Sequence, residues 1–140
     1  MADTSSARSG RSPSALGIAL WIVQVLLGVT FIGTGLWKLT TPIVKLAAVF
    51  PWMGQVSPAF MHLTGVVDLL GGVGLIVPAA TRIKPGLTVL AALGCAALQA
   101  CAIVFHVARG EAANTPFNFL LVGLALYVAW GRTKAPITPR

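Results

Sequence analysis

Acidic side chains are almost absent from this 140-residue chain, which has three Asp and Glu residues against ten Lys and Arg residues. Charged residues make up only 9% of the sequence and hydrophobic residues 56%, a balance too apolar for a soluble domain. The basic residues stand singly at the ends of apolar runs rather than in a cluster, which argues against a nucleic-acid partner. We therefore expect the lipid bilayer to be the solvent of this protein.

Sequence motifs for several kinds of chemistry are also missing. The sequence contains no phosphate-binding loop, no nucleophile motif and no zinc-ligand spacing, so we expect no metal site. Its two cysteines, Cys95 and Cys101, lie in one apolar run, and on a helix they would point in directions too different for a disulfide. A thiol oxidoreductase of the vitamin K epoxide reductase kind is excluded because there is no C-x-x-C pair.

Four apolar runs predict an all-α fold, a transmembrane four-helix bundle with a short interfacial helix between helices one and two. The runs cover about residues 16–37, 59–77, 86–106 and 116–131. We expect the second to end at Pro78, and the fourth to begin at Pro116 with Thr115 as its cap and to end at Trp130 and Gly131. The first run is longer than the apolar region of a signal peptide and has no A-x-A-like site after it, so we expect it to be retained.

The segment between the first two spans, residues 39–52, is amphipathic and rich in aromatic side chains. Thr41 and Pro42 suit the N-cap and first position of a short helix, and Pro51 suits its end. Aromatic residues beside Lys45 are typical of the membrane interface, where we expect this helix to lie.

The basic residues favour a cell-membrane protein with both termini in the cytoplasm, because positive charge gathers on the cytoplasmic side of membrane proteins. With that orientation the cytoplasmic side holds Arg8, Arg11, Arg82, Lys84, Arg132, Lys134 and Arg140. The outer side holds Lys38, Lys45 and Arg109. The expected organisation is a flexible basic tail (1–14), a four-helix transmembrane domain (15–131) and a second cytoplasmic tail (132–140).

Each of the first three apolar runs carries a stripe of small and polar residues at alternating steps of four and three, which places them on one helix face. The stripes are Gln24, Gly28, Phe31, Gly35 and Lys38; then Met61, Gly65, Asp68 and Gly72; then Ala92, Cys95, Gln99, Ala102 and His106. Small residues let membrane helices approach closely, and Gln24 and Gln99 are expected to bond between helices. We therefore treat Gly35, Gly65, Gly72, Gln24 and Gln99 as supporting residues.

Asp68 is the unusual member of these stripes, because a carboxylate near the bilayer centre costs roughly 2.5–3.5 kcal/mol and normally faces a partner or a water-filled cavity. The assumed topology brings Lys38, Asp68 and His106 into the outer half of the bundle, as candidates for ligand binding or proton relay. Contact between Asp68 and Lys38 requires the lysine to reach inward, and His106 is equally consistent with an interfacial ring in water. His62 lies off the Asp68 stripe, so axial haem ligation is disfavoured, and Arg109 and Glu111 are expected to be solvated.

The sequence resembles the DoxX-like family of small four-helix membrane proteins through GTGLWKL, GVVDLLGGVGLIVP and AIVFH, over about residues 15–131. The resemblance matches Gly35, Lys38, Asp68 and His106 to family positions, although the family more often has Glu where this chain has Asp68. It implies a link to quinone-dependent redox systems, since some relatives are subunits of thiosulfate:quinone oxidoreductases and others associate with membrane redox complexes.

Three functions are therefore open. The first is an auxiliary subunit of a membrane-associated oxidoreductase, with a quinone-like or other small apolar ligand beside Lys38, Asp68 and His106. The second is a proton-coupled transporter, assembled as a homo-oligomer, with Asp68 as the coupling site. The third is a non-catalytic assembly or structural protein in which Asp68 only stabilises the bundle.

The orientation yields a direct prediction. A reporter enzyme that is active only outside the cytoplasm, fused after Arg140, should give no signal, because the excess of basic residues retains that end inside. The same reporter fused after Arg109 should be active. Strong activity of the Arg140 fusion would overturn the assigned orientation.

Overall fold

The computed structural model describes residues 14–140, and the predicted tail 1–14 lies outside that range apart from Ser14. Its long helices are α1 (Ala15–Thr40), α3 (Pro58–Thr81), α4 (Gly86–Ala108) and α5 (Pro116–Lys134). A short helix α2 (Ile43–Val49) and two 3-10 turns, η1 (Pro51–Gln55) and η2 (Ala112–Asn114), connect them. The described residues form an all-α fold without strands.

The ends of the long helices follow local sequence signals. Ser14 caps α1 by accepting a hydrogen bond from the amide of Gly17 (3.0 Å), and Ser57 caps α3 by accepting one from Phe60 (3.1 Å). Thr115 occupies the N-cap of α5 as predicted, but its hydroxyl donates to the carbonyl of Ala112 instead of accepting from the helix.

Three boundaries differ from the sequence-based predictions. The second span does not end at Pro78, because α3 continues to Thr81, and a proline inside a membrane helix removes only one backbone donor. Thr41 is the C-cap of α1 and Pro42 is the N-cap of α2, so the short helix begins one residue later than expected. The last helix, α5, runs past Trp130 and Gly131 to Lys134.

The surface between the helix ends is apolar. Leu26, Leu63, Leu90 and Val104 are all more than half exposed, and each lies at least one turn inside a long helix. Three of the described helices, α1, α3 and α4, are long and apolar enough to cross a membrane. An apolar outer surface of this extent is suited to lipid rather than to water.

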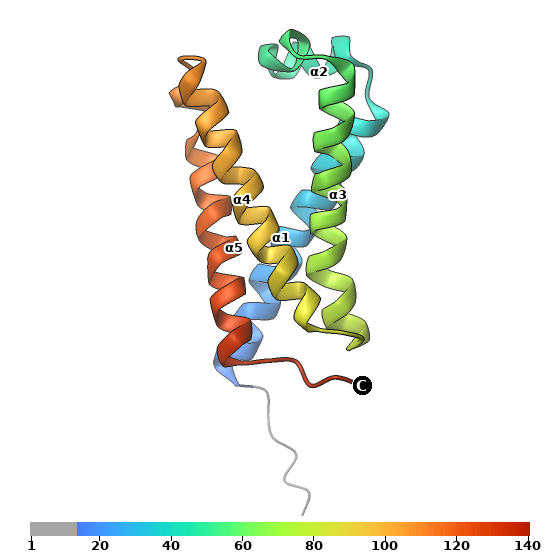
Figure 1. Ribbon diagram of the computed structural model, residues 1–140, viewed down its shortest axis with the longest axis vertical. Helices are drawn as coiled ribbons and strands as arrows, with labels where there is room; N and C mark the ends of the chain where they lie inside the picture. Colours follow the sequence, from blue (N-terminus) through green and yellow to red (C-terminus); the bar gives the residue numbers. More distant parts are fainter. Residues whose placement is uncertain (1–13) are drawn as a thin grey trace, which may run out of the picture.

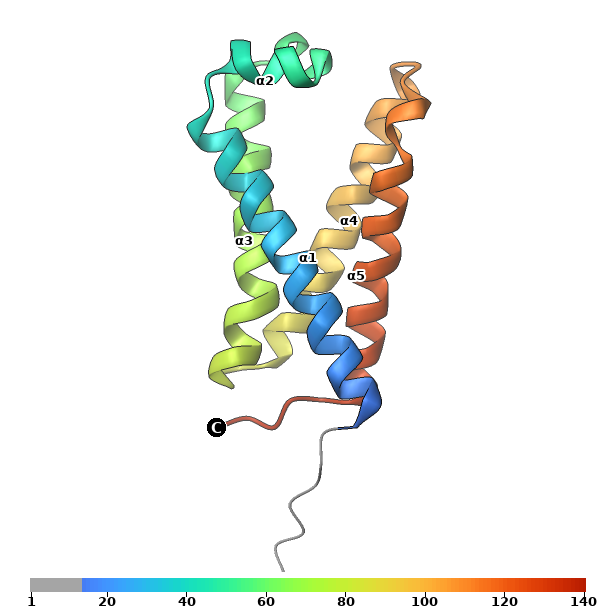
Figure 2. The same ribbon diagram turned by 180° about the vertical axis from the view of Figure 1, so that it is seen from behind.

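The long helices form two pairs, α1 with α3 and α4 with α5, as both ribbon views show (Figures 1 and 2). The pairs cross closely near the start of α1 and the end of α5, and they diverge toward the end that carries α2 and η1. We call the latter the α2 end. There α2 and η1 pack on the first pair through Leu46, Met53 and Met61.

Glycines determine how closely α1 and α3 pack. A Cβ atom added at Gly35 would lie 2.7 Å from the carbonyl oxygen of Gly65, and one added at Gly72 would lie 2.6 Å from that of Gly28. These distances leave no room for any side chain, so the predicted small-residue stripes of these two helices are indeed the packing faces.

We expect Gly35→Ala to destabilise the fold by about 1–3 kcal/mol, because the added methyl group collides with the α3 backbone. Unfolding of the purified protein in mixed detergent micelles would measure the loss. Gly33→Ala is the matched control, since a Cβ there meets nothing within 4 Å, and it should leave the free energy of unfolding unchanged or slightly raise it. Equal effects of the two substitutions would contradict this packing argument.

Candidate functional site

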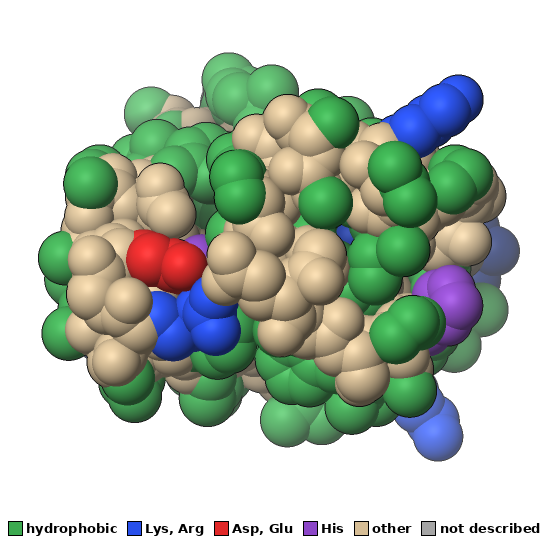
Figure 3. All heavy atoms as spheres, turned by 90° about the horizontal axis from the view of Figure 1, so that it is seen from above, with side chains coloured by type: hydrophobic (Ala, Val, Ile, Leu, Met, Phe, Trp, Pro, Cys, Tyr) green, Lys and Arg blue, Asp and Glu red, His purple; other side chains and the backbone are tan. Residues whose placement is uncertain are grey.

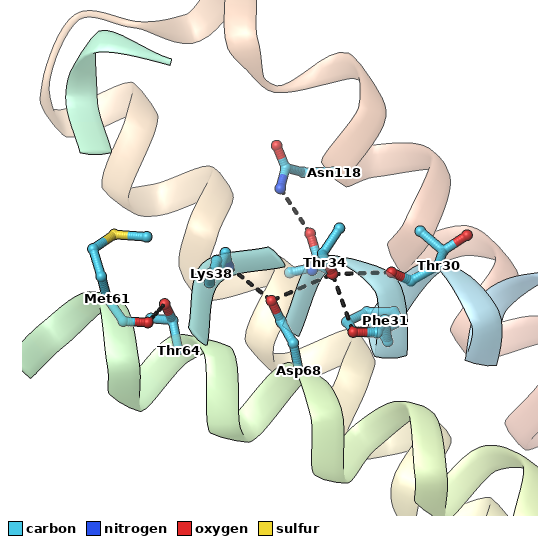
Figure 4. A network of polar contacts seen from close by, with 9 residues as sticks. Thr30, Phe31, Thr34, Lys38, Met61, Thr64, Asp68 and Asn118 are labelled. Atoms are coloured by element: carbon cyan, nitrogen blue, oxygen red, sulfur yellow. Dashed lines mark hydrogen bonds and ion pairs between the residues drawn. The ribbon is translucent and has the colours of Figure 1, made fainter. Parts of the chain in front are cut away.

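An ion pair between Lys38 of α1 and Asp68 of α3 lies at the centre of the candidate site. The lysine Nζ is 2.7 Å from the carboxylate Oδ2, and the aspartate side chain is only 4% exposed. The hydroxyl of Thr34 lies 3.5 Å from the same oxygen, and Figure 4 shows Lys38 and Thr34 both directed at Asp68. The contact that the sequence left open is therefore direct.

The glycine packing explains how Lys38 reaches Asp68. A Cβ atom at Gly65 would lie 3.1 Å from the Cβ of Lys38, so the stem of the lysine runs over a position that has no side chain. The supporting residues Gly35 and Gly65 thus bring the two charged residues together. Removing one member of a buried ion pair leaves the other charge without a partner and lowers the free energy of unfolding by about 3–5 kcal/mol. The pair therefore also holds α1 to α3.

On the second helix pair, Gln99 of α4 faces Asn118 of α5. The side-chain amide of Asn118 donates to Oε1 of Gln99 over 2.7 Å. The interhelical hydrogen bond expected of Gln99 is present, with Asn118 as a partner that the sequence analysis did not identify.

His106, in the last turn of α4, belongs to a polar cluster at the α2 end. Its ring is buried, and Nδ1 lies 3.0 Å from the Glu111 carboxylate, which also accepts from Nε of Arg109 (3.3 Å). Arg109 in turn donates to Gln55 of η1. In Figure 3, which looks onto this end, an acidic side chain lies beside basic ones with a histidine behind it. Arg109 is exposed and Glu111 is partly exposed, as expected of solvated residues, and these interactions in addition connect both to the cluster.

An aromatic residue of η1 completes the enclosure of His106. The Trp52 ring stands edge-on to the imidazole, with 5.2 Å between ring centroids and an interplanar angle of 84°. It also contacts Phe105 in the same edge-to-face manner. Through these contacts η1 connects the first helix pair, on which it packs, to α4 of the second pair.

Two cavities meet at these residues. The first, of about 330 Å³, extends along α1 and α5 past Thr30, Phe117 and Leu121. The second, of about 310 Å³, extends along α3 and α4 past Leu63 and Cys101. Both cavities share six lining residues: Lys38, Trp52, Asp68, Gln99, His106 and Asn118.

The remaining candidate residues are placed elsewhere. Gly72 lies deeper in the α1–α3 contact, and Gln24 lies at the opposite end, where its amide donates to the carbonyl of Leu75 (2.5 Å). The side chain of Gln24 also accepts from the guanidinium of Arg132, a buried residue that the sequence analysis counted only as a topology signal.

Nothing in the described residues brings metal ligands together. His62 is exposed and lines neither large cavity, and residues 14–140 contain no cluster of three or more His, Cys, Asp and Glu side chains. Cys95 is buried and Cys101 is exposed, and both are free thiols.

In a comparison with protein families, residues 22–129 of the 140 match the profile of the DoxX-like family. The chain belongs to the DoxX-like family. Together with its apolar helices, this membership makes it a multi-pass membrane protein. Comparison with curated proteins and with solved structures gives no match. All the residues that the two large cavities share lie inside the DoxX-like region.

The contacts of Glu111 predict a pH-dependent stability. The hydrogen bond to His106, with Arg109 nearby, holds the pKa of Glu111 below its ordinary value of 4.5. A carboxyl group whose pKa is lowered by folding stabilises the protein above its unfolded-state pKa and loses that contribution as the pH falls through the folded-state pKa. The wild type should therefore be more stable than Glu111→Gln at neutral pH, and the difference should shrink as the pH falls below about 4.5. Thermal unfolding of both proteins between pH 3 and pH 7 would test this, and a constant difference would contradict the assignment.

Proposed function

We propose that this DoxX-like protein binds a small lipid-soluble carbonyl compound of the quinone type, as an auxiliary subunit of a membrane redox system. The observation that carries the proposal is that two cavities on different sides of the bundle meet at Lys38, Asp68 and His106. Hydrogen-bonding side chains at the inner end of apolar cavities are the usual arrangement of a small-molecule site.

The proposal includes a fourth span. Helix α5 packs against α4, and Phe119, Leu120 and Trp130 project from it with more than half of each side chain exposed. We infer that α5 crosses the membrane beside α4 and completes a four-helix transmembrane bundle. In the proposed cell-membrane orientation, with both termini cytoplasmic, the α2 end faces outward, and the interfacial placement of α2 stays a prediction.

Access from lipid follows from the cavity walls. The first cavity is bordered by Phe117, which is 56% exposed, and the second by Leu63, which is 61% exposed. Both side chains belong to the apolar surface that we place in the hydrocarbon. A lipid-soluble ligand can therefore enter between helices without crossing water.

The polar groups at the junction match carbonyl chemistry. An ammonium group has three donor hydrogens, and the bond to Asp68 uses one of those on Lys38. His106 donates from Nδ1 to the Glu111 carboxylate, and when its ring is protonated Nε2 is a second donor that can face a ligand. Two donors of this kind suit a molecule with two carbonyl acceptors, and the rings of Trp37, Trp52 and Phe31 offer apolar contact to its ring.

Reduction of a quinone to a quinol takes up two electrons and two protons. In this proposal the electrons come from a partner oxidoreductase, a part that rests on the family resemblance. The protons would come from water at the α2 end and reach the ligand through His106, whose protonated ring is stabilised by the partly exposed Glu111 carboxylate.

A second candidate is a structural role, and the Lys38–Asp68 distance favours it. At 2.7 Å the carboxylate already has the partner that a buried charge requires, so the pair could serve only to fasten α1 to α3. The same pairing speaks against Asp68 as the free coupling acid of a transporter.

Tryptophan fluorescence can test ligand binding, because Trp37 and Trp52 line the first cavity. A short-chain ubiquinone analogue titrated into the full-length protein in lipid nanodiscs should quench the emission saturably, and Trp52→Phe should remove much of that quenching. The double variant Lys38→Met with Asp68→Asn removes both charges, so neither is stranded. We expect it to weaken binding by about 10–100-fold, the value of a charge-assisted hydrogen bond.

A pair of histidines provides the matched control. His106→Ala should weaken binding of the analogue about tenfold, the value of one hydrogen bond, while His62→Ala should not, because His62 lies outside both cavities. Quenching that is unchanged in both cavity variants would remove the ligand-binding proposal. If the wild type shows no saturable quenching and the double variant fails to fold, the structural role of the Lys38–Asp68 pair is supported instead of ligand binding.

A further inference from the structure

The end of the bundle opposite α2 holds a smaller cavity, of about 60 Å³. The C-terminal segment 135–140 crosses this end below α3 and α4, as Figure 1 shows, and the amide of Arg140 donates to the carbonyl of Arg82 (2.9 Å). The cavity is lined by Pro85, Gly86, Val89, Arg132, Pro136 and Ile137.

Arg132 is the charged residue of this cavity, and it is only 5% exposed. Its Nε donates to Oε1 of Gln24 (2.8 Å), and the guanidinium lies 5.0 Å from the centre of the Trp21 ring. Its Nη2 is buried without a hydrogen-bond partner within residues 14–140, and the side chain forms no ion pair there. A buried guanidinium held only by neutral groups is costly, so this geometry calls for an acceptor.

The first turn of α4 borders the same cavity. Helix α4 begins at Gly86, and no side chain caps it. The amides at the start of a long helix carry partial positive charge, and a Cβ at Gly86 would meet nothing within 4 Å, so a ligand can come close to the backbone. Thr88, in the same turn, also has a buried hydroxyl without a partner in the described part of the chain.

The surroundings of the cavity are positive. Arg82, Lys84, Lys134 and Arg140 are exposed around this end, whereas Asp68 and Glu111, the two acidic side chains that the structure describes, belong to the site at the α2 end. An anion therefore fits the charge of this region, and a neutral ligand would leave the charge of Arg132 uncompensated.

We propose that this cavity is a binding site for a single phosphate-type anion, either inorganic phosphate or the phosphate of a lipid headgroup. Arg132 donates from Nη2, the start of α4 contributes its first amide at Gly86, and segment 135–140 covers the bound group. Guanidinium groups and helix N-termini are both common donors to phosphate in proteins. The volume admits one such group in place of a few water molecules. This site is independent of the quinone-type ligand proposed for the α2 end.

Thermal unfolding of the full-length protein in a non-ionic detergent tests the site with two probes. One arm adds inorganic phosphate against chloride of equal ionic strength, and the other adds phosphatidylglycerol against an uncharged diacylglycerol. We expect at least one phosphate probe to raise the Tm of the wild type by about 2–5 °C. Stabilisation by the lipid alone assigns the site to a headgroup, and stabilisation by both assigns it to phosphate in general.

Arg132→Gln should abolish the shift, while Lys134→Gln, which removes an exposed positive charge from the same helix end, should retain it. Should Arg132→Gln fail to fold, Gly86→Leu tests the same site, because it fills the open space beside the cavity and keeps Arg132. The proposal is overturned if neither probe stabilises the wild type. It is also overturned if the Tm shift persists in Arg132→Gln. If Arg132→Gln does not fold, a Tm shift that persists in Gly86→Leu overturns it instead.

Discussion

The close approach of α1 and α3 is the constraint on which the candidate site depends. Because Gly35 and Gly65 leave no side chain between the two backbones, Lys38 passes over Gly65 and reaches Asp68. If the helices were a side chain further apart, the carboxylate would lie in an apolar bundle without its cation. The ion pair is therefore a result of small-residue packing, and it then reinforces the packing that produced it.

Spacing and hydropathy predicted most of the fold and part of the site. The long helices and the packing faces of α1 and α3 follow from residues that recur along a helix, where periodicity reports position directly. The contact between Lys38 and Asp68 stayed open, because spacing does not fix whether a lysine side chain reaches inward or outward. Glu111 was missed because it lies in a turn, where no period applies. Arg132 follows Leu121, Ala125 and Val128 at steps of four, three and four, which places it on the buried face of α5. It was missed because it was counted only among the basic residues that indicate the orientation of the chain. The predicted end of the second span at Pro78 was wrong because a proline in a membrane helix need not end the helix.

The two helix pairs are connected differently at their two ends. At the narrow end, Arg132 of α5 bonds directly to Gln24 of α1. At the α2 end, the hydrogen bonds of Lys38 and Gln99 stay within a pair. The pairs are linked there by η1, through Trp52 and Gln55, and by Phe60 of α3, which stacks on Phe105 of α4. The two large cavities lie at this end, where the pairs diverge.

The charges at the two ends determine what each can bind. Lys38 pairs with Asp68 and Arg109 pairs with Glu111, so these charges at the α2 end are balanced, and a neutral ligand with carbonyl acceptors can enter without disturbing either pair. Within residues 14–140, Arg132 interacts with the amide oxygen of Gln24 and the face of Trp21 and forms no ion pair, so its charge is left for an external group to balance. In the functions that we propose, the protein binds an uncharged ligand at one end and an anion at the other, because the acidic residues that the structure describes, Asp68 and Glu111, lie at the α2 end.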